Sequence, residues 1–163
     1  MTEPRLRPAV RALVIDPEAR ILLVRFEFED VGTVWAMPGG GIEPHETAME
    51  ALHRELSEEV GLHDAEIGPL IWDFARHRIG AMGPDWDGQR DRVHLIRVPV
   101  AFEPAPMMTW DQLRSEGLHE VRWWTAAEVA AHPGLFAPRR LPRLLDDLLR
   151  NGHPAEPTVF VET

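Results

Sequence analysis

Short apolar runs separated by turn residues dominate the hydrophobic pattern along much of the chain. Residues 9–15 and 21–26 are rich in Val, Ile and Leu, and Asp16-Pro17 lies between them. Asp-Pro is typical of a turn, so the pattern predicts two strands joined in a hairpin. Further strands are expected at residues 35–37, 67–74, 93–102 and 121–124.

Helical patterns occur in three places. The longest begins at Thr47, where Glu50 completes a capping box, and it ends at Gly61, which suits a left-handed C-terminal residue. A short helix is expected at residues 125–131. Pro142, followed by a stripe of leucines, predicts an amphipathic C-terminal helix.

The order of these elements favours an α/β fold with a mixed sheet covered by helices. A length of 163 residues suits a single domain spanning residues 1–163. Within it we expect residues 1–8 to be a peripheral leader and residues 151–163 a peripheral tail. Residues 80–92 and 104–117 are expected to be loops, because they combine glycine, proline and polar residues.

Composition excludes several kinds of chemistry. The chain has no cysteine, tyrosine or lysine, and all 17 basic residues are arginine. Thiolate nucleophiles, cysteine-based metal sites and lysine Schiff bases are therefore excluded. With a net charge of −10, the protein is not expected to have the basic surface of a nucleic-acid or membrane binder. No nucleic-acid polymer or membrane partner is therefore expected. Without an apolar span or signal-type leader, the expected location is the cytoplasm.

Three glutamates cluster on the long helix. Glu55, Glu58 and Glu59 lie at i, i+3 and i+4, roughly 90° from the apolar stripe of that helix. Like charges so close together repel, and they lie near the end of the helix where the dipole disfavours anions. A solvated helix face explains such a pattern in many proteins, but clustered carboxylates also suit a hard divalent cation.

The segment preceding that helix favours the cation site. Pro38-Gly39-Gly40-Gly41 cannot continue a helix or a central strand, so we expect a tight loop whose backbone closely approaches another group. Backbone carbonyls and amides in such a loop are available to a metal ion or to phosphate oxygens.

Together, loop and helix resemble the signature of the Nudix hydrolase family, G-x5-E-x7-R-E-U-x-E-E-x-G-U, where U is a bulky aliphatic residue. All nine fixed positions are present at the required separations between residues 40 and 62. The matching residues are Gly40, Glu46, Arg54, Glu55, Leu56, Glu58, Glu59, Gly61 and Leu62. We refer to residues 40–62 as the Nudix box.

The resemblance implies an α/β/α sandwich in which the box forms a loop–helix–loop. It implies hydrolysis of a nucleoside diphosphate linked to another moiety, with Mg²⁺ or Mn²⁺ as cofactor. By position, Glu58 and Glu59 would be metal ligands, and Glu55 a ligand or the base that orients water. The remaining roles fall to the Gly39 carbonyl as a further ligand, to Arg54 as the partner that holds Glu55, and to Gly40 and Glu46 as support for the loop.

Residues outside the box are less specific candidates. Glu120 is our first choice for a further catalytic acid, with Glu116 and Glu103 as alternatives, because some family members use a glutamate outside the box. Arginines bind phosphate well, and the tryptophans of loop-like segments, Trp86 and Trp110, can stack on a base. On that basis Arg25, Arg78 and Trp86 are candidate substrate contacts, and Arg76, Arg92 and Arg97 are further arginines of the same kind.

The same fold also carries two other functions. The first alternative is a nucleotide-sensing module without hydrolytic activity, but such modules often have eroded boxes and this box is complete. The isomerases of the fold are usually described as relying on a cysteine, which this chain lacks. The substrate stays open among ADP-ribose-like compounds, dinucleoside polyphosphates, nucleoside triphosphates and nucleotide sugars, and a homodimer is possible.

Overall fold

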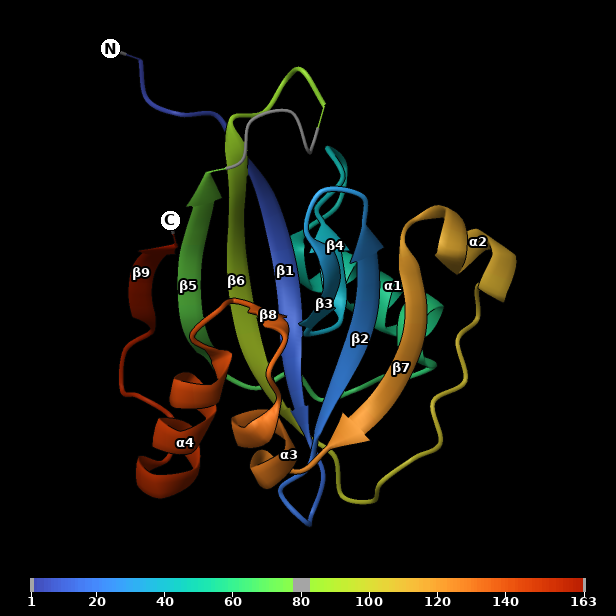
Figure 1. Cartoon of the computed structure of the whole chain (residues 1–163), viewed down its shortest axis with the longest axis vertical. Helices are drawn as coiled ribbons and strands as arrows, with labels where there is room; N and C mark the ends of the chain where they lie inside the picture. Colours follow the sequence, from blue (N-terminus) through green and yellow to red (C-terminus); the bar gives the residue numbers. More distant parts are fainter. Residues whose placement is uncertain (1, 78–82, 163) are drawn as a thin grey trace.

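The apolar runs pair into one curled, mixed sheet (Figure 1). The computed structural model describes residues 2–77 and 83–162. Within these ranges the strands are β1 (Leu6–Ile15), β2 (Ile21–Phe28), β3 (Gly32–Ala36), β4 (Gly39–Gly41), β5 (Leu70–His77), β6 (Gly88–Arg97), β7 (Leu118–Trp124), β8 (Leu135–Ala137) and β9 (Thr158–Glu162). The helices are α1 (Ala48–Val60), α2 (Trp110–Ser115), α3 (Ala126–Ala131) and α4 (Leu141–Asn151).

The strands run in the order β8-β3-β2-β1-β6-β5-β9, with β4 paired to β1 and β7 paired to β2. Strands β1 and β6 are parallel, whereas β1 and β2 form the predicted antiparallel hairpin around the Asp16-Pro17 turn. The two strands of this hairpin separate beyond Ile15 and Ile21, and β4 pairs with the part of β1 that β2 leaves. The sheet therefore opens between β1 and the β2–β3 pair, close to the glycines of β4.

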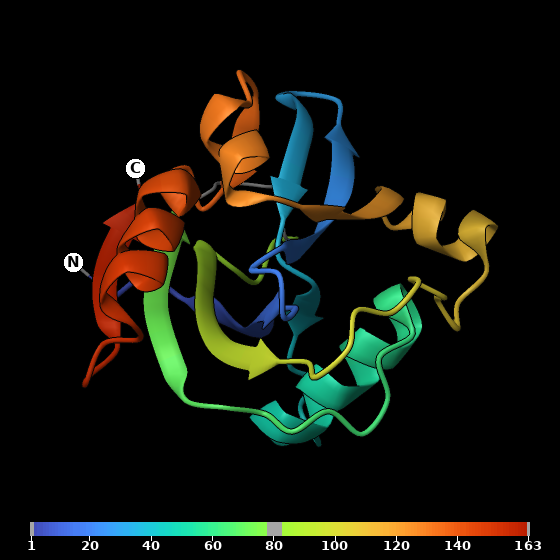
Figure 2. The ribbon, with the colours of Figure 1, turned by 90° about the horizontal axis from the view of Figure 1, so that it is seen from below.

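Each face of the sheet buries its own hydrophobic core. One core lies under α1, where Leu52, Leu56 and Val60 pack with side chains of β1 and β2. The other lies under α3 and α4, where Val129, Leu145 and Leu148 pack with the opposite face. Figure 2 shows α1 on one side of the curled sheet and α3 and α4 on the other. This arrangement confirms the predicted α/β/α sandwich with a mixed sheet.

Several element boundaries differ from the sequence-based expectations. The glycine segment is a short strand, β4, and the strand expected at residues 67–74 is displaced to Leu70–His77. Strand β6 begins at Gly88, inside the expected loop, and ends at Arg97, short of the expected position 102. The sequence of its first half is typical of a loop, because two of its inward-pointing residues, Gln89 and Asp91, are polar although they are buried.

Other departures concern segments expected to be irregular or peripheral. Helix α2 lies within residues 104–117, and its capping box of Thr109 and Gln112 is visible in the sequence. The expected leader already enters β1 at Leu6, and the expected tail carries β9, which pairs in parallel with β5. Among the described residues, no helix is long and apolar enough to cross a membrane.

Candidate active site

Helix α1 places the box glutamates as its sequence predicts. The Thr47 hydroxyl accepts from the backbone N–H of Glu50, and the Glu50 carboxylate accepts from that of Thr47, which completes the capping box. At the other end Gly61 adopts the left-handed conformation, with φ of 73°. Because its apolar stripe packs under the sheet, α1 holds the three glutamates at the side of that stripe, where Glu55 and Glu59 lie against β4.

The β4 glycines bring the backbone against these carboxylates. Gly39 has φ of 143°, and a Cβ atom there would collide with the backbone of β1 at Val10. A Cβ atom at Gly40 would lie only 2.6 Å from Oε1 of Glu55. The close approach expected from the glycine sequence is therefore present, and it packs β4 between β1 and α1.

Glu59 is the most deeply buried of the three box glutamates. It is 4% exposed, and its Oε1 accepts a hydrogen bond of 2.8 Å from the backbone N–H of Gly39. Burial, reinforced by the neighbouring charge of Glu55, raises the pKa of Glu59 well above its ordinary value. Burial also raises the pKa of Glu55, against the opposing effect of Arg54. Arg54 and Arg11 compensate the charge of these carboxylates only in part, because the effect of burial on both pKa values is larger.

Arg54 connects the box loop to the helix. Its Nε donates to Oε2 of Glu46 at 2.7 Å and its Nη2 to Oε1 at 2.8 Å, a bidentate pair. The hydrogen bonds from Arg54 are the main reason why the pKa of Glu46 falls to about 2. Nη1 of Arg54 donates to Glu55 at 3.0 Å and to Glu58 at 3.4 Å, so the predicted contact with Glu55 is present.

The carboxylates of Glu55, Glu58 and Glu59 are suitable ligands for a hard divalent cation, but their oxygen atoms do not converge on one position. In the described ranges no three histidine, aspartate or glutamate side chains are arranged closely enough to hold a metal ion. Instead, the guanidinium of Arg54 lies between Glu55 and Glu58. The donors of Glu55, Glu58 and Glu59 are all oxygen atoms, and burial raises the pKa values of Glu55 and Glu59. A hard cation such as Mg²⁺ or Mn²⁺ suits this donor set.

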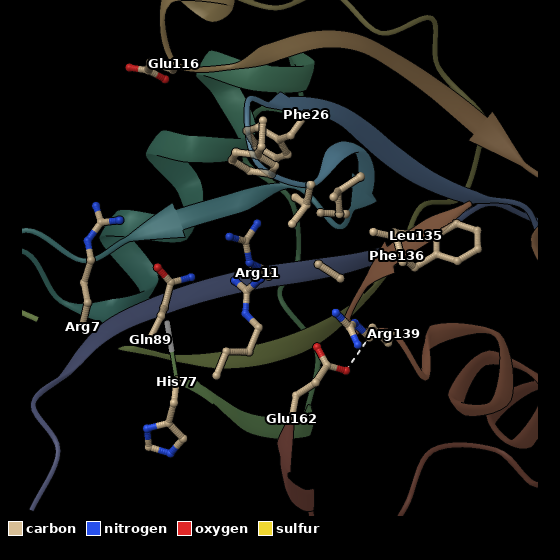
Figure 3. A pocket seen from close by; sticks show the side chains of 16 residues that line it. Arg7, Arg11, Phe26, His77, Gln89, Glu116, Leu135, Phe136, Arg139 and Glu162 are labelled. Carbon is tan, nitrogen blue, oxygen red and sulfur yellow. Dashed lines mark hydrogen bonds between the residues drawn. The ribbon is translucent and has the colours of Figure 1, made fainter. Parts of the chain in front are cut away.

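A cavity of about 500 Å³ opens between β1 and the β2–β3 pair (Figure 3). Its apolar wall is formed by Phe26, Phe28, Val31, Val34, Leu135 and Phe136. Its cationic residues are Arg7, Arg11, Arg76 and Arg139. The guanidinium of Arg7 packs against Gly41 and makes no ion pair with a described residue. The cavity thus combines an apolar surface with positive charge in an otherwise acidic protein.

Arg11 is fixed by a buried polar network. Asp91 is fully buried and accepts from Nε of Arg11 at 2.6 Å, from Nε2 of Gln89 at 2.9 Å and from Nη2 of Arg76 at 3.1 Å. Burial alone would raise the pKa of Asp91, but Arg11 and Arg76 lower it below its ordinary value. The network joins β1, β5 and β6 on the floor of the cavity.

Arg11 also links the cavity to the box carboxylates. Burial opposes its charge, but Asp91 and, to a smaller degree, Glu59 and Glu55 raise the pKa of Arg11. Glu116 lines the cavity as well, and its charge contributes to the raised pKa of Glu59. An anionic group bound in the cavity would therefore lie next to the carboxylates of α1.

Comparison with known families agrees with this geometry. The family model described as NUDIX domain matches residues 5–145, most of the chain. The protein belongs to the Nudix hydrolase family. The prediction of a Nudix enzyme made from the box is thereby confirmed.

Relatives within the Nudix family include an RNA pyrophosphohydrolase of Helicobacter pylori strain G27, which is 35% identical over 111 residues. That alignment covers 62% of this chain and 69% of the relative. An RNA pyrophosphohydrolase of Halorhodospira halophila is 45% identical over 99 residues, covering 56% and 53% of the two chains. The solution structure of the E. coli ORF135 protein is 25% identical, with a TM-score of 0.60 and coverage of 94% and 96%.

The candidate residues outside the Nudix box lie in different places. Nε of Arg25 donates to Glu120 at 3.1 Å, and neither residue lines the cavity. Strand alternation explains this, because Phe26 faces the cavity and its neighbour Arg25 points to the other face of β2. Trp86 is half-buried outside the cavity, and Arg78 lies outside the described residues. Of the alternative acids, Glu116 is the one that lines the cavity.

Most of the residues that line the cavity were not predicted from the sequence. Arg76 was among the further arginines considered, but Arg7, Arg11 and Arg139 were not singled out. Residues 7 and 11 belong to β1 and alternate with buried Val10 and Ala12, a pattern that places arginines on one face of an apolar strand. That alternation was the available signal.

Proposed function

We propose that this Nudix hydrolase uses a divalent cation, Mg²⁺ or Mn²⁺, to hydrolyse the diphosphate linkage of a nucleoside diphosphate joined to another moiety. The observation that carries the proposal is the adjacency of the box carboxylates to an arginine-lined cavity, with Arg11 between them. Pyrophosphohydrolase relatives support the same type of reaction.

The metal would be held by the carboxylates of Glu55, Glu58 and Glu59 together with the carbonyl of Gly39. Such an ion neutralises phosphate charge and makes a phosphorus atom more susceptible to attack by water. A bound cation would also compensate the negative charges of Glu55 and Glu59, whose ionised forms are disfavoured by burial. Arg54 would have to share or release Glu55 and Glu58, because it now occupies the space between them.

The chain itself supplies binding and proton transfer. Arg7, Arg11 and Arg76 line the cavity with guanidinium groups that suit the oxygens of a diphosphate. Glu55 is desolvated and its pKa is raised, which suits a carboxylate that accepts a proton from water. For a further acid outside the box we favour Glu116 over Glu120, because Glu116 lines the cavity and Glu120 does not.

Hydrolysis of an RNA 5′ end is the second candidate, because the relatives in Helicobacter and Halorhodospira are RNA pyrophosphohydrolases. The net charge of −10 favours a small nucleotide over a long polyanion. A sensing module without activity is less well supported, since every fixed position of the box is present.

Hydrolysis across a substrate panel tests the proposal. The panel contains nucleoside triphosphates, ADP-ribose, NADH, diadenosine polyphosphates, nucleotide sugars and a short 5′-triphosphorylated RNA, each with Mg²⁺, Mn²⁺ or EDTA. We expect one class to be cleaved by the wild type with metal, and not by the Glu59→Gln variant. Metal-dependent nucleotide binding without any cleavage would support the sensing module instead.

A further inference from the structure

Strand β9 is a part of the cavity that the family match does not include. The match ends at residue 145, whereas β9 spans Thr158–Glu162. The strand is firmly attached, because it pairs in register with β5 and Phe160 stacks on Phe74 with ring centroids 5.0 Å apart. The guanidinium of Arg140 covers the Phe160 ring at 4.1 Å from its centroid.

At its end β9 contributes a carboxylate to the cavity. Glu162 lines the cavity, and its Oε1 accepts a hydrogen bond of 2.6 Å from the backbone N–H of Arg139 (Figure 3). Glu162 lies beside Arg76 in the β5–β9 register, and its charge favours the protonated form of that arginine. It therefore ties the segment between β8 and α4 to the polar network on the cavity floor.

Arg139 is the residue that this hydrogen bond positions. It lines the cavity, and its guanidinium makes no ion pair with any part of the chain that the structure describes. Figure 3 shows Arg139 and Glu162 at one end of the cavity, with Arg7 toward the other end and Arg11 between. The cavity thus has a second polar end, remote from Arg7.

The chemistry of that end suits a nucleobase better than a phosphate. Leu135 and Phe136 line the cavity next to Arg139 (Figure 3), and an apolar surface of this kind suits a flat base better than a phosphate. Glu162 beside Arg139 disfavours a second anionic group at this end, whereas a guanidinium donates readily to the carbonyl oxygens of a base.

We propose that Arg139 is a specificity-determining residue that donates hydrogen bonds to carbonyl oxygens of the nucleobase, and that Glu162 on β9 is the residue that positions it. The inference rests on the proposed function, because it assumes that the diphosphate binds at the end next to the box. Guanine, cytosine and uracil carry such carbonyl oxygens, and adenine has none.

The test compares KM and kcat for GTP, CTP, UTP and ATP with Mg²⁺. Arg139→Ala should raise KM for GTP, CTP and UTP by about 10-fold or more, the effect of losing a charge-assisted hydrogen bond, with kcat within about 3-fold. KM for ATP should change by less than about 3-fold. Calorimetric binding of GDP, CDP, UDP and ADP to the same proteins gives the comparison without turnover.

Glu162 is tested through its dependence on Arg139. Glu162→Ala should raise the same three KM values in the wild type, yet add little in the Arg139→Ala background, because it acts through that arginine. Glu162→Gln keeps an acceptor for the backbone N–H and should remain close to the wild type. Val159→Ala, on the same strand with a side chain that is 71% exposed, is the matched control and should change nothing.

Unchanged KM and diphosphate affinity for the guanine, cytosine and uracil nucleotides in Arg139→Ala would overturn this inference while leaving the proposed function intact. Equal effects of Glu162→Ala in both backgrounds would overturn the positioning role. If the wild type binds nucleotides without cleaving any substrate of the panel, the proposed function fails and the diphosphate affinities still decide the inference. A wild type that cleaves a substrate of the panel but binds none of the four diphosphates would overturn the inference alone.

Discussion

The carboxylate of Glu55 is held against the backbone of Gly40, so that the space for a single methyl group is missing. A Cβ atom at position 40 would lie 2.6 Å from Oε1 and 2.8 Å from Cδ of Glu55. The clash is with the end of a flexible side chain, which can rotate away at little cost to the fold. The absence of a side chain at Gly40 therefore leaves the space that Glu55 occupies.

If Glu55 belongs to the proposed metal site, we expect Gly40→Ala to lower kcat by roughly 10- to 100-fold, while the melting temperature changes little. Gly39→Ala is the informative contrast, because it combines a backbone clash with φ of 143° and should destabilise the fold by at least about 1–3 kcal/mol. Steady-state kinetics and thermal denaturation separate the two effects. A Gly40→Ala enzyme with normal kcat would show that Glu55 does not act from this position.

Glu58 offers a direct test of the carboxylate site. Its side chain is 33% exposed and its hydrogen bond to Arg54 is long, at 3.4 Å, so its removal should leave the fold intact. We expect Glu58→Gln to lower kcat by roughly 10²- to 10⁴-fold and to weaken activation by Mg²⁺. The control is Glu66→Gln, an exposed glutamate outside the box. Near-normal rates at saturating Mg²⁺ would remove Glu58 from the proposed metal site.

At the scale of elements, β1, β5 and β6 depend on one ion cluster. Asp91 on β6 is the shared acceptor of Arg11 on β1 and Arg76 on β5. These arginines lower its pKa despite burial, so the stabilisation is fully present above the ordinary aspartate pKa and is lost as pH falls through the lowered value. Replacing this carboxylate leaves two largely buried guanidinium groups without their anion.

We expect Asp91→Asn to reduce the free energy of unfolding by about 3–5 kcal/mol at pH 7, the usual effect of breaking a buried pair. The difference from the wild type should stay constant between about pH 5 and 8 and shrink below about pH 4. Urea denaturation at several pH values measures it, with the exposed Asp85→Asn as control. A difference that grows as pH falls would contradict the assignment of Asp91 as a buried anion.

Element-level prediction from sequence succeeded where local chemistry decides the structure. The capping box at Thr47 and the glycine at position 61 define α1, and the sequence alone places the box glutamates on its side. It failed where tertiary pairing decides. Strand β6 begins with polar residues, which can be buried because they have partners on β1 and β5. Strand β9 is a short Val-Phe-Val run that is far from other apolar runs in the sequence and forms a strand by pairing with β5.

The candidate site divides in the same way. The acidic half of the site is one contiguous segment, so its spacing in the sequence identifies it, whereas the cavity is lined by residues of β1, β2, β3, β5, β6, β8 and β9. Arg25 and Glu120 illustrate the limit, because residue type suggested them and strand alternation, together with their mutual ion pair, directs them elsewhere. The alternation along β1 places Arg7 and Arg11 on one face of that strand, but it does not indicate that Arg76 and Arg139 line the same cavity.

For the whole molecule, net charge should limit the length of any RNA substrate. A surface with a net charge of −10 offers no continuous attraction for a phosphate backbone, so contacts should end near the first nucleotides. If 5′-triphosphorylated RNA is cleaved, we expect kcat/KM to stay level or fall as its length increases from two to twenty nucleotides. Rates measured over such a length series at constant ionic strength check this. A steady rise with length would reveal an RNA-binding surface that the charge balance conceals.

Strand β9 has a further consequence for the solubility of the protein. It forms the outer edge of the sheet and covers β5, whose Trp72 and Phe74 are 2% and 1% exposed. A protein shortened to the limits of the family match would lose β9 together with the second half of α4, including Leu148. The longer and more aromatic β5 would then become the free edge, and exposed apolar edges of this kind pair with one another between molecules. Aggregation on expression, rather than mere loss of activity, is the expected behaviour of such a fragment.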